Sequence, residues 1–179
     1  MRKPGEIRGY DFVIDNLTNC NVYLLDHSAQ ITIDDCSQCN FWFGPVNGSV
    51  FFRDCENCTV SVSCSQFRMK SCTNFDVFCY AASDPSIEYS KGLRFAPLRL
   101  SYPDQDVHFR NAKLDNGSDF WSQVFDFNQV EGESHWSLLP PDEFNVSAVP
   151  IEGMAEPVCP VDRHVSYGGQ LTDDIIVGS

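Results

Sequence analysis

Residues 12–97 repeat one pattern of apolar and polar positions about every 18 residues. Each copy has two short segments in which alternate positions are apolar, such as Ile31 and Ile33 followed by Phe41 and Phe43. Alternation with a period of two is typical of β-strands that bury one face. A small or apolar residue at the polar corner between them recurs at positions 20, 39, 58, 75 and 93, with spacings of 19, 19, 17 and 18 residues. Repeats of this length predict a solenoid, in which each unit buries its apolar face against its neighbours.

The repeat contains no segment with helical periodicity. We therefore predict an all-β fold, a single-stranded parallel β-helix of about five coils. Consecutive coils would stack about 4.8 Å apart, and equivalent positions would form continuous inward and outward rows. A Greek-key sandwich of antiparallel hairpins is the alternative, although a sandwich would not require the register of the repeat to persist.

The register decays after Leu98, where the sequence predicts an irregular C-terminal cap. Residues 107–109 are predicted to form a short strand. Residues 119–127 are predicted to form at least one helical turn, with Asp119 as its N-cap, and their aromatic side chains to cover the open end of the solenoid. Residues 1–150 would thus be one domain, followed by an acidic, extended or partly disordered tail at 151–179.

Four cysteines have the spacing of a zinc ribbon: Cys36, Cys39, Cys55 and Cys58. In the register of the repeat they occupy two columns of positions. One column is 17, 36, 55 and 72, the other is 20, 39, 58 and 75, and we call the two together the cysteine ladder. The same columns also hold Leu17 and Phe75. Cysteine suits an apolar column because it is small and commonly buried. We therefore predict buried, reduced thiols and no metal site.

The chain carries a formal net charge of −13, with a pI near 4.4. This charge argues against nucleic acid or an anionic membrane surface as the main partner. The chain has no apolar run of transmembrane length and no signal-peptide core at its start, so we expect a cytoplasmic protein. Because the first repeat begins close to residue 1, we also expect an excised domain without its native N-terminus.

An acidic corner offers a second candidate chemistry, hydrolysis of a polysaccharide by paired carboxylates. It comprises Asp34, Asp35, Asp54 and Glu56. Acidic residues at solenoid corners usually satisfy backbone donors through local turns, and a charge of −13 does not suit a polyanionic substrate. This interpretation is therefore weaker than a scaffold role.

A third candidate is an outward-facing arginine. If Phe67 and Met69 point inward, then Gln66, Arg68 and Lys70 must point outward from the same strand. The strand would hold Arg68 rigidly. The residues equivalent to Arg68 in earlier coils are Val13, Thr32 and Phe51.

The neighbouring coil leaves two interpretations of this face open. Glu88 falls beside Lys70 in the repeat, so a solvated charged face with a Glu88–Lys70 or Glu88–Arg68 pair is one of them. The other is an arginine presented to a partner.

Four features of the sequence resemble the tubulin-binding cofactor C domain family. They are the cysteine ladder, residues 44–52 (Gly-Pro-Val-Asn-Gly-Ser-Val-Phe-Phe), residues 65–68 (Ser-Gln-Phe-Arg) and residues 135–140 (His-Trp-Ser-Leu-Leu-Pro). The likeness runs from about Pro4 to Pro150 in one unbroken register. It implies a right-handed parallel β-helix, with residues 1–150 as a cofactor-C-like domain.

The resemblance further implies a GTPase-activating protein for an Arf-like small GTPase in its GTP state, acting in the traffic of lipidated proteins to cilia. Arg68 would be the arginine finger, assisted by Gln66. The partner would hold GTP and Mg²⁺, so the domain would need no cofactor and would have no complete active site of its own. Lys70 stands where members of this branch have a second arginine. The residues expected at the partner interface are Glu88, Phe127, Phe51 and Lys70.

The family also implies alternatives. One is a tubulin-folding cofactor that stimulates GTP hydrolysis by tubulin, and another is a non-catalytic β-helix module that binds actin or a GTPase. For location, the family adds the ciliary base, or a membrane reached through an acylated N-terminal segment absent from this chain. Direct membrane contact is not expected from the residues present.

Overall fold

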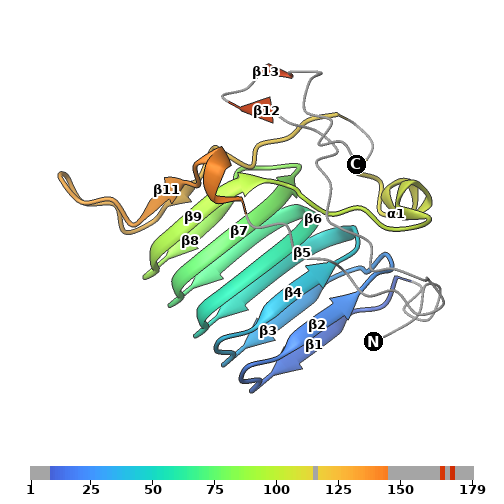
Figure 1. The fold of residues 1–179 in the computed structure, drawn as a ribbon, viewed down its shortest axis with the longest axis horizontal. Helices are drawn as coiled ribbons and strands as arrows, with labels where there is room; N and C mark the ends of the chain where they lie inside the picture. Colours follow the sequence, from blue (N-terminus) through green and yellow to red (C-terminus); the bar gives the residue numbers. More distant parts are fainter. Residues whose placement is uncertain (1–8, 115–116, 145–165, 168–169, 172–179) are drawn as a thin grey trace.

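A computed structural model describes residues 9–114, 117–144, 166–167 and 170–171 of the chain. Its strands stack one above another from the N-terminal coil to the C-terminal end, and form a solenoid of about five coils (Figure 1). Within the described residues, no helix is long and apolar enough to cross a membrane. All named strand pairs of the solenoid are parallel, so the predicted β-helix is confirmed and the antiparallel sandwich is wrong.

Each coil contributes one strand to each of two rows. The first row is β1, β3, β5, the second half of β6, β8 and β10. The second row is β2, β4, the first half of β6, β7, β9 and β11. The bounds of the strands are β1 Phe12–Asp15, β2 Asn21–Leu24, β3 Ile31–Asp34, β4 Asn40–Phe43, β5 Val46–Arg53, β6 Glu56–Lys70, β7 Thr73–Ala81, β8 Ser86–Glu88, β9 Lys91–Pro97, β10 Phe125–Asp126 and β11 Trp136–Leu138.

The pairing register is the one that the repeat predicts. Ile31 pairs with Phe12 in the preceding coil and with Val50 in the next, and Val50 pairs in turn with Phe67. This inward row is fully buried from Ile31 onward. Inside the coils, phenylalanine rings stack edge to face, with Phe52 and Phe75 centroids 5.1 Å apart. Burying one such side chain contributes about 1.5–3 kcal/mol, which fixes the inward phase of every strand.

Each coil turns its corner with two residues in the left-handed backbone conformation, one immediately before each ladder position. Left-handed backbone is tolerated best by asparagine, aspartate and glycine, which explains the polar corners. Asp35 and Asp54 occupy such corners, with φ of 51° and 53°, and Asp34 is paired with Arg53. The acidic corner therefore has a structural role in turning the chain. The two corner columns are Asn16, Asp35, Asp54, Ser71 and Tyr89, and Asn19, Gln38, Asn57, Asn74 and Gly92.

The cysteine ladder forms the columns that the sequence predicts. Cys58 lies in register with Phe75 and Leu93 in the next two coils. The Cys55 thiol donates to the carbonyl oxygen two residues earlier, at 3.1 Å, and Ser90 makes the same kind of bond at 3.0 Å with its hydroxyl. All eight cysteines within the described ranges are free thiols, and burial raises the pKa of the Cys58 thiol to about 12. Across those ranges, no group of three or more His, Cys, Asp or Glu side chains is placed to hold a metal ion.

The region after the repeat differs from the prediction at residues 107–109. They are not a strand but part of α1 (Gln105–Asn111), which lies beside the solenoid (Figure 1). Gln105, His108 and Ala112 are buried at helical spacing, whereas Val107 is exposed. Apolar residues at positions 107 and 109 are compatible with both structures, and burial of the other helix face decides the outcome.

The predicted helix at 119–127 is also wrong. Asp119 accepts hydrogen bonds from the backbone N–H groups of Ala81 and Trp121, at 3.1 and 3.2 Å, and so ties this segment to the end of β7. The chain then forms the short strand β10. Trp121 packs in the main core, as expected of a cap, but Phe125 and Phe127 are exposed.

The end of the chain is described only in part. A short 3₁₀ helix, η1 (Pro141–Glu143), follows β11. Within the predicted tail, β12 (Ser166–Tyr167) and β13 (Gln170–Leu171) form an antiparallel pair. The other residues of the predicted tail lie outside the described ranges.

Candidate partner-binding site around Arg68

The second half of β6 presents Arg68 outward from a strand that is paired on both sides. Phe67 and Met69 are buried, with at most 1% of their surface exposed, whereas Gln66 and Arg68 are exposed. This alternation confirms the predicted phase. Arg68 pairs with Phe51 of β5 and Ser86 of β8, so both neighbouring coils fix its backbone.

Arg68 forms no ion pair or side-chain hydrogen bond with any described residue. Its guanidinium instead lies 4.9 Å from the centre of the Phe51 ring, a favourable cation–π contact. Arg53 lies 5.5 Å from the centre of the same ring, and the Asp34 carboxylate accepts two hydrogen bonds from it, at 2.6 and 2.5 Å. Phe51 therefore supports the exposed arginine, while the neighbouring arginine is neutralised.

The charged pair predicted on this face forms between Lys70 and Glu88. Lys70 Nζ lies 3.2 Å from Glu88 Oε1, and the pairing of β6 with β8 places the two residues side by side. Both side chains are about two-fifths exposed, so this pair contributes little to stability. Glu88 is thus paired with Lys70 and not with Arg68, and it places one negative charge in the row next to Arg68.

Beyond Glu88, β10 extends the same face by one further strand. Phe125 pairs with Ser86, so it lies in the outward row of Arg68, two coils away. The Phe127 backbone N–H donates to Ile87 at 3.0 Å, which places the Phe127 side chain beyond Glu88. Phe127 is 62% exposed. The structure thus brings together all six site residues predicted from the sequence: Arg68, Gln66, Glu88, Phe127, Phe51 and Lys70.

Sequence reasoning missed several neighbours of this face. Tyr89 occupies a corner and is exposed, and Phe125 is exposed in the Arg68 row. Asp126 and His135 form a hydrogen-bonded pair behind them, at 2.7 Å. These residues lie at or beyond the end of the recognisable repeat. Only a register that continued through β10 would have revealed them.

A second group of titratable side chains lies next to α1. The buried Asp26 carboxylate accepts from the backbone N–H of His27 at 2.8 Å and lies 3.4 Å from the Nε2 atom of His108. Tyr102 contacts the other ring nitrogen of His108 at 3.0 Å. Burial lowers the pKa of His108 below its usual value. These contacts attach α1 to the solenoid, and the groups lie too deep to meet a large substrate.

The chemistry available on the Arg68 face is electrostatic. Glu88 is held by Lys70, and none of the described residues on this face provides a nucleophile paired with a base. What the face offers is an exposed guanidinium on a doubly paired strand, in contact with the Phe51 ring. Such an arrangement can stabilise negative charge that a partner brings.

The chain is similar to known proteins over most of its length. The family model described as "Tubulin binding cofactor C" matches residues 9–127. Protein XRP2 of Danio rerio is 51% identical over 150 residues, which cover 84% of this chain and 40% of that protein. Protein XRP2 of Homo sapiens is 49% identical over 150 residues, with 84% and 43% covered. The chain spans about two-fifths of the length of these curated relatives.

More distant relatives carry the name of the family. Tubulin-specific chaperone C of Homo sapiens is 32% identical over 148 residues, covering 81% of this chain and 43% of that protein. Among solved structures, "Tubulin Binding Cofactor C from Leishmania major" superimposes with a TM-score of 0.61 at 27% identity. The superposition covers 72% of this chain and 90% of that one.

Proposed function

Because the chain belongs to the tubulin binding cofactor C family, we propose that it is a GTPase-activating domain that supplies Arg68 to an Arf-like small GTPase. The observation that carries this proposal is Arg68 itself. It is an exposed cation with no carboxylate partner among the described residues, held on a doubly paired strand, in a chain whose formal net charge is −13.

The mechanism follows from the geometry of the guanidinium. In GTP hydrolysis, negative charge develops on the phosphate oxygens, and an arginine supplied by a partner stabilises it with an effect of about 10³–10⁵ in rate. A planar, permanently charged fork suits this role better than an ammonium group. The partner holds GTP and Mg²⁺ and positions the water, so the domain supplies one charge to an active site in another protein.

The neighbouring residues have distinct proposed roles. Gln66 lies two residues before Arg68 on the same outward side, where its amide can contact the partner's active site. The Lys70–Glu88 pair lies in the adjacent row and contributes to the interface. The Phe51 ring contacts the guanidinium of the finger, and Phe127 adds apolar contact area.

Single-turnover GTP hydrolysis by a purified Arf-like GTPase tests the proposal. The domain should accelerate hydrolysis, Arg68→Ala should abolish nearly all of the acceleration, and Arg68→Lys should not restore it. Arg110→Ala is the matched control, because Arg110 is an exposed arginine of α1 away from this face. The proposal is wrong if wild type gives no acceleration, or if Arg68→Ala accelerates as well as wild type.

A tubulin partner is the second candidate, favoured by the names of the family and of the more distant relatives. The same finger would then act on GTP held by tubulin. Hydrolysis by tubulin, measured with the companion cofactors present, separates the two candidates. A pulldown with GTP- and GDP-loaded GTPase tests for a non-catalytic module, which would bind without accelerating hydrolysis.

The cellular setting belongs to the same proposal. A domain that resets an Arf-like GTPase would act in the cytoplasm or at the ciliary base, where hydrolysis would end one round of lipidated cargo delivery. Localisation of the tagged full-length protein, compared with its Arg68→Ala variant, tests this setting.

A further inference from the structure

Three exposed aromatic side chains lie together at the C-terminal end of the Arg68 face. Tyr89, Phe125 and Phe127 are 66%, 55% and 62% exposed. The Phe125 and Phe127 rings meet edge to face, with centroids 4.8 Å apart. Aromatic residues are enriched where proteins bind partners, and a contiguous exposed group of them marks an interaction site.

This group is continuous with the proposed finger. The pairing of β6, β8 and β10 places Phe125 in the outward row of Arg68, with Ser86 between them. Two coil steps correspond to about 10 Å at the usual spacing of paired strands. Phe127 follows Lys70 and Glu88 in the adjacent row. A partner whose nucleotide reaches Arg68 would therefore also cover these rings.

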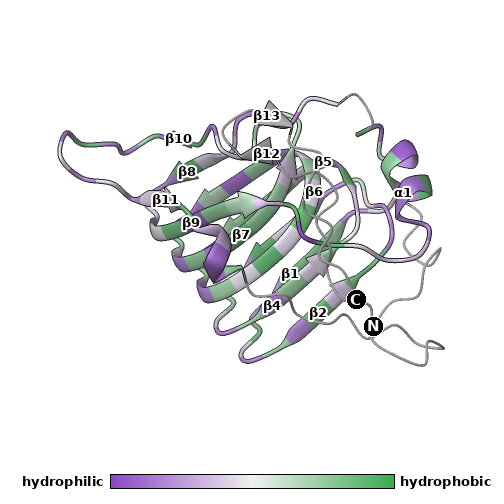
Figure 2. Cartoon of the chain, turned by 45° about the horizontal axis from the view of Figure 1, so that its top comes forward, coloured by the Kyte–Doolittle hydropathy of each residue, from purple (hydrophilic) through white to green (hydrophobic). Residues whose placement is uncertain are grey.

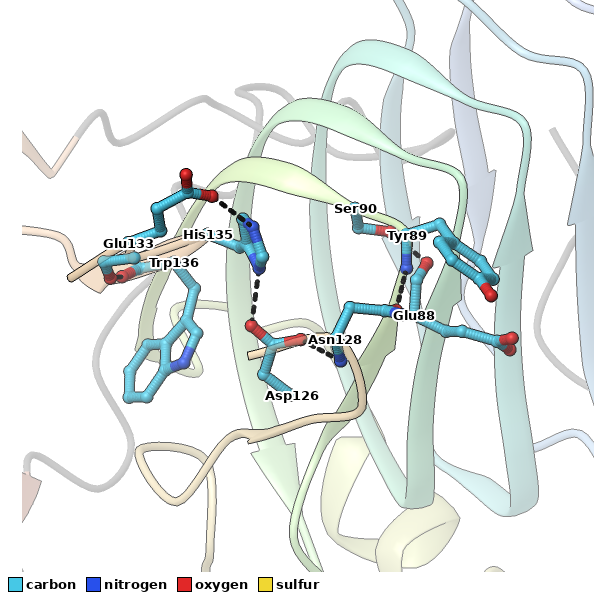
Figure 3. Close-up of polar contacts among 9 residues, drawn as sticks. Glu88, Tyr89, Ser90, Asp126, Asn128, Glu133, His135 and Trp136 are labelled. Atoms are coloured by element: carbon cyan, nitrogen blue, oxygen red, sulfur yellow. Dashed lines mark hydrogen bonds and ion pairs between the residues drawn. The ribbon is translucent and has the colours of Figure 1, made fainter. Parts of the chain in front are cut away.

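A buried carboxylate holds the aromatic group in place. Only 3% of the Asp126 side chain is exposed. Its Oδ2 atom lies 2.7 Å from Nδ1 of His135, and its Oδ1 atom accepts the backbone N–H of Asn128 at 2.8 Å. Asn128 Oδ1 in turn accepts the backbone N–H of Tyr89 at 2.7 Å. Figure 3 shows the Asp126 carboxylate directed at the His135 ring and the Asn128 side chain directed at the backbone of Tyr89.

The carboxylate lies at the base of a projecting segment. Residues 127–134 extend beyond the stacked coils between β10 and β11 (Figures 1 and 2). Asp126 belongs to β10, and His135 directly precedes β11, so their contact closes the base of the projection. The His135 carbonyl accepts the backbone N–H of Leu93 at 3.2 Å, which anchors the closure to β9.

The backbone conformation of Tyr89 is a second observation that supports an interaction site in this region. It adopts a left-handed backbone conformation, with φ of 48°, in the corner column that elsewhere holds asparagine, aspartate or serine. That conformation is unfavourable for a bulky residue and persists only where the surroundings enforce it. The corner of the coil imposes this conformation, as it does in the other coils. Asn128 additionally holds the backbone N–H of Tyr89, and Lys70 Nζ lies 6.0 Å from the centre of the exposed ring.

We propose that Tyr89 and Phe125 extend the interface residue Phe127 into an aromatic docking surface for the GTPase, and that Asp126, Asn128 and His135 are positioning residues that hold it. The inference rests on the proposed function. Its occupant is the GTP-bound face of the same GTPase, because the surface continues the Arg68 row. The positioning residues act through the aromatic residues and contact no nucleotide.

Titration of the domain against GTP-loaded GTPase tests the docking surface. Tyr89→Ala and Phe125→Ala should each raise the half-saturating concentration about 5- to 30-fold and leave the maximal single-turnover rate within twofold. Val107→Ala, which truncates an exposed apolar residue of α1, is the matched control and should change neither value. Unchanged half-saturation in both aromatic variants of an active domain would overturn the docking surface.

Two variants at position 135 test the positioning role. His135→Asn keeps an N–H donor that can reach Asp126, whereas His135→Leu removes the donor and keeps an apolar side chain of similar bulk. His135→Leu should raise half-saturation about tenfold and speed hydrogen exchange at the backbone amides of Tyr89 and Asn128. His135→Asn should stay within about twofold of wild type in both measurements. Unchanged exchange in His135→Leu would refute the positioning role.

The two readouts separate this inference from the function on which it rests. If the wild-type domain accelerates hydrolysis by no GTPase, both the proposed function and the docking surface are wrong. The hydrogen-exchange measurement then remains the test of the positioning residues. If wild type is active and the aromatic variants bind normally, only the docking surface falls.

Discussion

Replacement of Phe51 tests how Arg68 is held before it meets a partner. In the free domain, the ring of Phe51 is the only described group in specific contact with the guanidinium, at 4.9 Å from the ring centre. Phe51→Leu removes the ring and keeps an apolar side chain. Phe51→Tyr keeps the ring. The inward neighbours Val50 and Phe52 are fully buried and remain unchanged, so neither substitution should disturb the core.

The magnitude follows from the strength of the contact. A cation–π interaction at an exposed site contributes about 0.5–1 kcal/mol. If the contact orients Arg68 toward the nucleotide, its loss should lower the maximal single-turnover rate by about 2- to 5-fold, since about 1.4 kcal/mol corresponds to a factor of ten. This is far smaller than the loss of about 10³-fold or more expected for Arg68→Ala.

The assay is single-turnover hydrolysis at saturating domain, with half-saturation measured in parallel. We expect a 2- to 5-fold lower maximal rate for Phe51→Leu and a rate within error of wild type for Phe51→Tyr. A Phe51→Leu domain as fast as wild type would show that the ring does not orient the finger. A faster one would show that the ring holds the finger back. A change confined to half-saturation would make Phe51 a docking residue instead.

Two further predictions concern stability. Burial raises the pKa of Asp119 to about 6, above the value of 3.8 for an unperturbed group, so its stabilising contribution is complete below pH 3.8 and is lost as the pH rises through 6. At pH 7.5, Asp119→Asn should therefore raise the free energy of unfolding by up to about 3 kcal/mol, and with it the melting temperature, whereas at pH 4 both should change little. An unchanged or lower melting temperature at pH 7.5 would contradict this. Cys55→Ser should keep the hydrogen bond to the Arg53 carbonyl, because Ser90, in the same column, makes the equivalent bond to Glu88, and it should cost about 1–2 kcal/mol in a urea titration. Stoichiometric zinc in metal analysis of the wild-type protein would refute the interpretation of the ladder as an apolar column.

The sequence predicts the solenoid well because each strand reports its phase independently. A shift of the pairing register by one residue would move every inward side chain of a strand to the surface, so the repeat is compatible with only one register. That register places Phe67 inside and Arg68 outside. It also identifies Lys70 and Glu88 as neighbours without any knowledge of their side-chain contacts.

The rest depends on interactions that no repeat encodes. Residues 107–109 fit a strand or a helix equally well, and the burial of Gln105 and His108 selects α1. Asp119 resembles a helix N-cap, but besides the local N–H of Trp121 its carboxylate accepts the N–H of Ala81 at the end of a distant strand. The contact between Asp126 and His135 closes a segment outside the repeat. No repeat relates Asp126 to His135, so only the folded structure shows that the two residues meet.

The coil spacing has a consequence for how such a surface can change. An outward side chain on this solenoid occupies one of a series of equivalent places, and neighbouring places are one strand spacing, about 4.8 Å, apart. Val13, Thr32, Phe51, Arg68 and Ser86 are five such places in one row. Moving the arginine to position 51 or 86 would shift its charge by one step without altering the core. The reach of the finger is therefore a discrete variable, which mutation can adjust only in whole steps along the axis.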